Sequence, residues 1–265
     1  MKIAIISDIH EDAVSLKKAL AIAERERCDH IVCLGDILGY PYKRAAYAHT
    51  RNASECILLI KKYCSAVVKG NHDIFHISRF PEHETYFRFP DEWYRLSDTE
   101  KLSMSEGRVW HYSDDSPVML SDNEIAYLES LPESSFYETD GLKMLFSHYL
   151  YPNLTGYESS LNGINADASK HFAFMEKHEC QISFSGHLHP DGVGLCYQPN
   201  RSLASKFLAG FRFYQYGIKK IKERRCTIAL PALADNGREN GFAVFDTGQR
   251  ILTTVSLNLS RRFHL

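Results

Sequence analysis

The sequence has 265 residues, of which 44% are hydrophobic and 24% are charged, as in ordinary globular proteins. Its net charge of −2 excludes a global positive field that would attract nucleic acid or an anionic membrane surface. Seven cysteines without a C-x-x-C pair, no membrane-length apolar run and no signal-peptide pattern lead us to expect a cytoplasmic protein with reduced thiols.

The first part of the chain predicts strands that alternate with helices. Ile3–Ile6 is a continuous apolar run, as in a buried strand, and Asp12 can cap the helix that follows it. His30–Leu34 and Ala66–Val68 are the next two predicted strands, with a helix near residues 53–63 between them. This strand–helix–strand–helix–strand order predicts a parallel sheet with helical crossovers.

The second part predicts further helices and a hairpin. Ser121 and Glu124 form a capping-box motif at the start of a helix, and Asp140-Gly141 is a hairpin turn signal. Asn165 can cap a helix that ends at Lys177. The remaining predicted strands are Tyr137–Thr139, Leu142–Phe146, Gln181–Phe184, Cys226–Ala229, Phe242–Phe245 and Ile251–Ser256.

Two segments interrupt this pattern, and we expect a single domain over residues 1–265 with insertions at about 83–120 and 199–225. The first segment is rich in aromatic residues and could cap a pocket, or could simply be a packed excursion. The second combines many lysines and arginines with aromatic residues, a composition that can hold a nucleotide or a single strand. Because such runs are usually solvated surface, we expect no nucleic-acid partner and no membrane contact.

Five predicted strands each end in side chains that can bind a metal. These side chains are Asp8 and His10, then Asp36, then Asn71 with His72, then His148, and finally His187 with His189. An extended backbone would point His187 and His189 to the same side. Each fragment alone is more often structural, but together they exceed the ligands of one tetrahedral zinc ion. They suit two metals about 3.5–4 Å apart with a carboxylate between them.

In this order the motifs D-x-H, G-D, G-N-H-D, S-H and G-H-x-H resemble the calcineurin-like metallophosphoesterase superfamily, from Lys2 to about Asp246. The run Gly35–Pro41 is similar to the loop G-D-x-x-G-Y-G-P of its small bacterial phosphodiesterase branch, as is the capped helix that ends at Leu131-Pro132. The resemblance implies a four-layer αββα sandwich of two mixed β-sheets flanked by helices. Its dinuclear metal site would lie at the carboxyl ends of the strands.

The resemblance also implies a role for each candidate residue. Asp8, His10 and His189 would hold the first metal, Asn71, His148 and His187 the second, and Asp36 would bridge them. His72 would be free to face the substrate as the catalytic residue, where it could donate a proton to the leaving group or stabilise its charge. Asp73 could orient His72 or make a structural hydrogen bond. Two manganese or iron ions are expected as cofactors, and zinc also fits these ligands.

The implied function is metal-dependent hydrolysis of phosphodiesters, or of nucleotide-type phosphate esters and anhydrides, by attack of a hydroxide that bridges the metals. The expected partner is a small phosphorylated or nucleotide substrate. Tyr40 could stack on a base, and Arg238 could reach a phosphate, although its neighbours depart from the family pattern N-P-G-S-V-G-Q-P-R.

Three other functions remain as alternatives. A phosphomonoesterase is the first, although the D-R-G of protein phosphatases is absent after Asp36. A nuclease is the second, supported only by the basic segment. A non-catalytic scaffold of the same fold is the third, and the complete set of candidate ligands argues against it.

Overall fold

Three short apolar runs form parallel strands near the N-terminus, and two helices connect them. The computed structural model describes residues 1–40, 47–83, 86–158, 168–199, 210–235 and 237–258. In this structure β1 (Lys2–Ile6) pairs with β2 (His30–Cys33), and β2 pairs with β3 (Ala66–Val67). Helices α1 (Ala13–Arg25) and α2 (Ala53–Tyr63) form the crossovers, as the alternating pattern predicts.

Antiparallel strands from the end of the chain complete this first sheet. Strand β11 (Gly241–Asp246) pairs with β1, and a hairpin joins it to β12 (Ile251–Ser256). Strand β9 (Gly217–Lys220) pairs with β12 and forms the edge. The strand order of the first sheet is therefore β3-β2-β1-β11-β12-β9.

A second six-stranded sheet has the order β4-β5-β6-β10-β7-β8. Its central pairs β5–β6 and β6–β10 are parallel, whereas the outer pairs are antiparallel. The strands are β4 (Ser134–Thr139), β5 (Leu142–Ser147), β6 (Ile182–Ser185), β7 (Val193–Tyr197), β8 (Arg212–Tyr214) and β10 (Cys226–Ala229).

The two sheets pack face to face, and alternating residues of each strand meet between them. Ile3 and Ile5 of β1 belong to the core between the sheets, where the ring of Phe184 lies 5.7 Å from that of Phe146 and 5.4 Å from that of Phe245. Their burial excludes water from the centre of the space between the two sheets.

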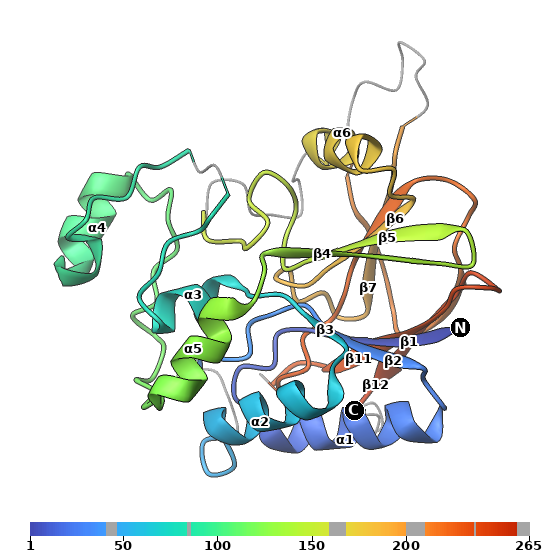
Figure 1. Ribbon diagram of the computed structural model, residues 1–265, viewed down its shortest axis with the longest axis horizontal. Coiled ribbons are helices and arrows are strands. Elements are labelled where there is room, and N and C mark those ends of the chain that lie inside the picture. Colours follow the sequence, from blue (N-terminus) through green and yellow to red (C-terminus); the bar gives the residue numbers. More distant parts are fainter. Residues whose placement is uncertain (41–46, 84–85, 159–167, 200–209, 236, 259–265) are drawn as a thin grey trace.

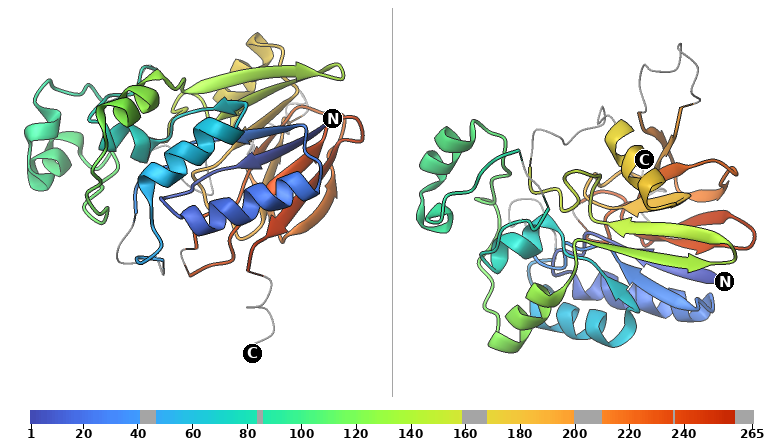
Figure 2. Two further views of the ribbon diagram at one scale, coloured as in Figure 1. Left: turned by 60° about the horizontal axis from the view of Figure 1, so that its bottom comes forward. Right: turned by 45° about the horizontal axis from the view of Figure 1, so that its top comes forward.

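Helices cover the outer faces and make four layers. Ala4 and Ile6 of β1 point away from the second sheet and pack in a cluster with α1 and α2, whereas α6 (Ser169–Lys177) covers the second sheet. Figure 1 shows α1 and α2 on one side of the sheets and α6 on the other, and Figure 2 shows the layers from two further directions. The expected αββα sandwich of two mixed sheets is thus confirmed.

A helical excursion projects from one end of the sandwich (Figure 1). It contains α3 (Asn71–His76), the short 3-10 helix η1 (Trp93–Arg95), α4 (Asp98–Ser105) and α5 (Asp122–Ser130). Many of its aromatic side chains form a separate core that we call the aromatic cluster. The cluster comprises Ile74, Phe75, Phe80, Phe87, Phe89, Trp93, Tyr94, Leu96, Val109, Tyr112 and Tyr157.

Several local signals in the sequence are confirmed by hydrogen bonds. The Asp12 carboxylate accepts the Ser15 N–H at the start of α1, and Glu124 and Ser121 form the capping box of α5. Helix α6 begins at Ser169, and Asn165, its expected start, lies outside the described residues, as do residues 84–85 and 200–209 of the two expected insertions. The single-domain assignment stays a prediction. None of the described helices combines the length and apolar character needed to cross a membrane.

Candidate metal centre

The candidate ligands follow strands of both sheets at the same end of the sandwich. Asp8 and His10 follow β1, Asp36 follows β2, and Asn71 begins α3 just after β3, all in the first sheet. His148 follows β5, and His187 and His189 follow β6, in the second sheet. Because parallel strands end at one edge of a sheet, loops from both sheets converge there.

Nitrogen and oxygen atoms of these residues come together in three overlapping groups, each with its ligand atoms within 4.8 Å of one another. The first group matches the set predicted for the first metal. The third holds Asp36 with two of the residues predicted for the second metal, and the middle group includes His72. The groups are Asp8, His10 and His189; His10, Asp36 and His72; and Asp36, His148 and His187.

Asp36 and Asn71 occupy the positions that a two-ion site requires. Asp36 belongs to two of the groups, and its Oδ2 lies 3.1 Å from His148 Nε2. Asn71 Oδ1 lies 3.0 Å from Nδ1 of His187, so the amide oxygen joins the third group. The geometry therefore brings together all seven residues that the sequence predicts as ligands.

Two imidazoles are held in the tautomer that a metal needs. Nδ1 of His10 donates to the Gly39 carbonyl, and Nδ1 of His148 donates to the Leu34 carbonyl, each at 2.8 Å. Because a carbonyl only accepts, Nδ1 of each ring keeps its proton, and the neutral form of each ring would offer the Nε2 lone pair to a cation. His10 Nε2 lies 3.4 Å from His189 Nε2, a contact between ring nitrogens that a cation between them would relieve. The donor set therefore fits a metal site.

The charges of the cluster also suit cations. Burial lowers the pKa of His10 to about 4 and that of His187 to about 3, which favours their neutral forms. Burial would raise the pKa of the Asp8 and Asp36 carboxyls, but the surrounding imidazoles outweigh it and hold both pKa values far below the usual range. Burial also opposes protonation of His148, yet the Asp36 carboxylate raises its pKa to about 9.

The backbone of the site is unusual, and it corrects the expectation of an extended G-H-x-H segment. His187 has φ of 65° and His189 has φ of 45°, both in the left-handed region. The two rings consequently belong to different groups instead of lying side by side on one face. Asp8, His10 and Asp36 also have positive φ, so five of the seven candidate ligands adopt a conformation that non-glycine residues seldom take.

Two glycines let the loops approach the carboxylates closely. A Cβ on Gly70 would collide with Asp36 Oδ1, and a Cβ on Gly186 would collide with Ser7 Oγ and Asp8 Oδ2. Backbone N–H groups then orient the carboxylates, because His72 N donates to Asp36 Oδ1 at 2.9 Å and His187 N donates to Asp8 at 3.1 Å. Glycine is needed at these two positions for the approach itself.

His72 is paired with a carboxylate that the sequence analysis did not identify. Its Nδ1 lies 2.6 Å from Asp115 Oδ2, which also contacts His76 Nε2 at 3.2 Å. Burial would lower the pKa of His72, but Asp36 and Asp115 outweigh it and raise that pKa to about 9. Asp73 has the structural role, because it accepts the N–H groups of Ile37, Leu38 and Gly70.

The helical excursion supplies further side chains to the site. The Tyr112 hydroxyl accepts a hydrogen bond from Asn71 Nδ2 at 3.2 Å, and the ring of Trp110 lies edge-on to that of His187 at 5.9 Å. With Asp115, these residues come from residues 110–115, where the sequence shows no periodicity. Their polar and aromatic side chains are the only sequence feature that marks them, and this feature alone did not predict that they lie at the site.

The two expected substrate contacts lie outside these groups. The ring of Tyr40 is only 3% exposed, packs against Tyr47 and Ala234, and has the Arg51 guanidinium 4.7 Å from its centroid. Its faces are therefore occupied by the protein. Arg238 is exposed on a loop after β10. Neither residue contributes an atom to the three metal-competent groups.

A family can be assigned at this point. Residues 1–196 match the model described as the calcineurin-like phosphoesterase superfamily domain. The chain belongs to this superfamily. Calcineurin-like phosphoesterases act on phosphate esters and bind a dinuclear metal centre, for which the three groups supply candidate ligands.

Three individual proteins are similar to this chain in sequence or in structure. An uncharacterized protein of Methanocaldococcus jannaschii is 25% identical over 187 residues, which cover 67% of this chain and 65% of that protein. A metallophosphoesterase from Sphaerobacter thermophilus is similar in structure, with a TM-score of 0.64 and 21% identity over 97% of this chain and 88% of the other. A hypothetical protein of Pyrococcus horikoshii gives a TM-score of 0.53 and 14% identity, with 96% and 87% covered. At these identities the structural likeness establishes the fold.

Replacing Gly186 should lower the metal content of the protein. In Gly186→Ala the new Cβ would displace Asp8, so we expect bound metal to fall from about two ions per chain to about one or fewer. Metal content after manganese loading and desalting, measured by mass spectrometry, tests this. Gly248→Ala is the control, because its Cβ would meet only Asp246 Oδ1 at 3.8 Å. Equal metal content in both variants would contradict the proposed ligand role of Asp8.

Proposed function

We propose that this protein is a metal-dependent phosphodiesterase that cleaves phosphodiesters or nucleotide-type phosphate esters and anhydrides. The observation that supports it most strongly is the position of Asp36, whose carboxylate is shared by two groups of metal-competent atoms. Shared carboxylates are typical of two-ion phosphoesterase sites. The family match supports the same reaction class.

In this proposal Asp8, His10 and His189 hold one cation, Asn71, His148 and His187 hold the other, and Asp36 lies between them. Two cations there would neutralise charge on phosphoryl oxygens and make water acidic enough to act as the nucleophile at neutral pH. The mixture of carboxylate, amide and imidazole donors suits manganese or iron, and zinc also fits.

His72 is the proposed proton donor to the leaving oxygen. Its backbone N–H is fixed on Asp36, and Nδ1 is fixed on Asp115, so its ring lies beside the shared carboxylate. Gly39 permits this position, because a Cβ there would collide with the His72 ring. The side chain of His72 is 21% exposed, which leaves an edge of the ring open to a bound ester.

The excursion supports a substrate with an aromatic or base-like group. Trp110 is 41% exposed and its ring lies next to His187, whereas Tyr112, two residues farther along the chain, is buried. An exposed indole at the rim of a metal site can stack on a flat ring of the substrate. Arg238 stays a prediction as a phosphate contact, and the expected stacking on Tyr40 would require its buried ring to move.

Substitutions should separate catalysis from metal binding. In His72→Ala we expect two bound ions but a turnover lower by about 10²–10⁴, most severely with poor leaving groups, because the proton donor is lost. In Asp36→Asn we expect lower metal content, because an amide oxygen is a weaker ligand than a carboxylate. His111→Ala, at an exposed histidine of the excursion, is the control. Wild-type turnover in His72→Ala would remove His72 from the mechanism.

Asp115 should act through His72. Asp115→Asn removes the charge that orients the ring, so we expect kcat to fall by about 10–100-fold, as for other residues that orient a site group. KM for the same ester and the number of bound ions should stay unchanged. Exposed Asp91, replaced in the same way, is the control. Loss of metal from Asp115→Asn, or unchanged kcat, would contradict this positioning role.

A substrate panel tests the reaction itself. We expect the manganese-loaded protein to cleave nitrophenyl phosphodiesters and dinucleoside polyphosphates faster than nitrophenyl monoesters or single-stranded DNA. Release of nitrophenol and chromatography of nucleotides measure the rates. Cleavage of monoesters alone would reject the phosphodiesterase assignment in favour of a phosphomonoesterase. Cleavage of no ester in the panel would reject the proposed function as a whole.

A further inference from the structure

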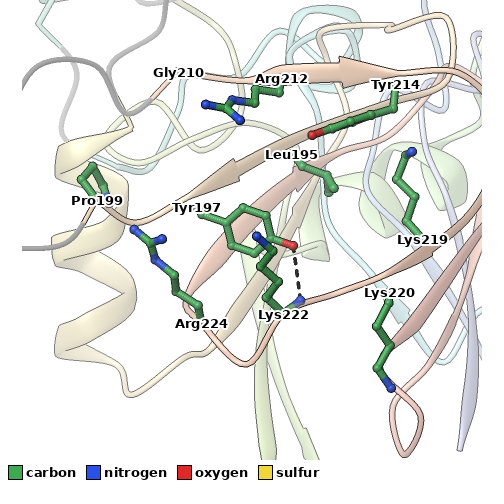
Figure 3. A pocket seen from close by; sticks show the side chains of 10 residues that line it. All are labelled: Leu195, Tyr197, Pro199, Gly210, Arg212, Tyr214, Lys219, Lys220, Lys222 and Arg224. Carbon is green, nitrogen blue, oxygen red and sulfur yellow. Dashed lines mark hydrogen bonds between the residues drawn. The ribbon is translucent and has the colours of Figure 1, made fainter. Parts of the chain in front are cut away.

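A basic pocket opens between the free edges of the two sheets. Strand β8 is the edge of the second sheet, and β9, the next strand along the chain, is the edge of the first. Between them lies a cavity of about 530 Å³. The side chains that line it include Tyr197, Arg212, Tyr214, Lys219, Lys222 and Arg224 (Figure 3).

The charge of this pocket is strongly one-sided. Residues 210–225 contain six lysines and arginines but only one acidic residue, Glu223, in a protein whose net charge is −2. Within the described part of the chain, no carboxylate lies within ion-pair distance of Arg212, Lys219 or Lys222. The guanidinium of Arg224 donates to the neutral carbonyl of Gln198. Among the described residues, these cations therefore have no counter-ion.

Two tyrosine rings lie against the ammonium groups of two lysines in the pocket. Lys219 Nζ lies 4.0 Å from the centroid of the Tyr214 ring, and Lys222 Nζ lies 5.7 Å from that of Tyr197. Figure 3 shows Lys222 in front of Tyr197, with Arg212 and Arg224 on either side of the same opening. The backbone N–H of Lys222 also donates to the Tyr197 hydroxyl at 3.3 Å, which fixes the ring. The positive groups are thus positioned before any ligand arrives.

The Lys220 end of the pocket is remote from the metal centre, whereas Tyr214 at its other end pairs with Val193, four residues after His189. Lys220 pairs with Ile251, Ile251 with Asp246, and Asp246 with Lys2, at the start of β1. Asp8 lies six residues after Lys2, which corresponds to a distance of roughly 20 Å at the usual rise of a strand. None of the residues that line the pocket belongs to the three metal-competent groups.

We propose that the basic pocket binds a compact, multiply phosphorylated anion, either a free polyphosphate chain or the phosphates of a nucleotide. Its volume lies within the range of small-molecule sites, and its convergent lysines and arginines match several phosphate groups. Lysines on an edge strand also discourage aggregation. Protection against aggregation alone would not require that cations from β8, β9 and the loop after β9 surround one cavity.

Binding of inorganic tripolyphosphate to the full-length, metal-loaded protein tests the proposal by titration calorimetry. We expect Lys219→Ala/Lys222→Ala to weaken binding by about tenfold or more, because two phosphate contacts are lost. Lys61→Ala/Lys62→Ala is a matched control. It removes the same charge from two lysines that also lie over tyrosine rings, 5.4 Å from Tyr127 and 4.9 Å from Tyr63. Turnover of a nitrophenyl diester should be equal in both double variants.

Further ligands identify the source of the phosphates. Tighter binding of a non-hydrolysable ATP analogue than of tripolyphosphate would assign the pocket to nucleotides, and equal binding would assign it to the phosphate chain. Equal affinity of the pocket variant and the wild type would overturn the proposal. An affinity that rises steadily with the length of a thymidine oligonucleotide would overturn it as well, because the surface would then be one for nucleic acid.

Discussion

Two buried carboxylates at one point of the fold are the constraint on which the rest of the site depends. Asp8 and Asp36 are almost completely inaccessible to water, and like charges in such surroundings stay ionised only when positive charge lies between them. His148 Nε2 lies 3.1 Å from one carboxylate and 3.8 Å from the other, and further imidazoles surround them. The close glycines and left-handed residues follow from the need to bring these groups together from separate loops.

Much of this arrangement could be predicted from the sequence, because metal-competent residues directly follow apolar strands and strand ends of one direction converge. The local backbone conformation of the ligand segments could not be predicted. A spacing of two residues suggested an extended G-H-x-H segment, but the left-handed backbone sends His187 and His189 to different groups. Asp115 was also missed, because its contact with His72 spans 43 residues and no periodic pattern surrounds it. Likewise, β8 and β9 are short, exposed strands without a buried face to mark them.

The helical excursion contacts both a proposed metal ligand and the proposed proton donor. Its aromatic cluster gives residues 86–112 a hydrophobic core. This core also includes Tyr157, which follows β5 in the chain. Tyr112 belongs to that core and also holds Asn71, while Asp115 nearby holds His72. A change in the packing of this segment would therefore alter the position of the proposed proton donor and of one proposed ligand together.

The donors of each outer group come from both sheets. Asp8 and His10 belong to the first sheet and His189 to the second, while Asp36 belongs to the first and His148 and His187 to the second. A cation held by either group is consequently a cross-link between the two halves of the sandwich, placed where their loops meet. Ion binding then contributes to the cohesion of the protein as well as to its chemistry. Depletion of metal would let the sandwich open first at this end, and a protease would find its earliest cleavage sites in these loops.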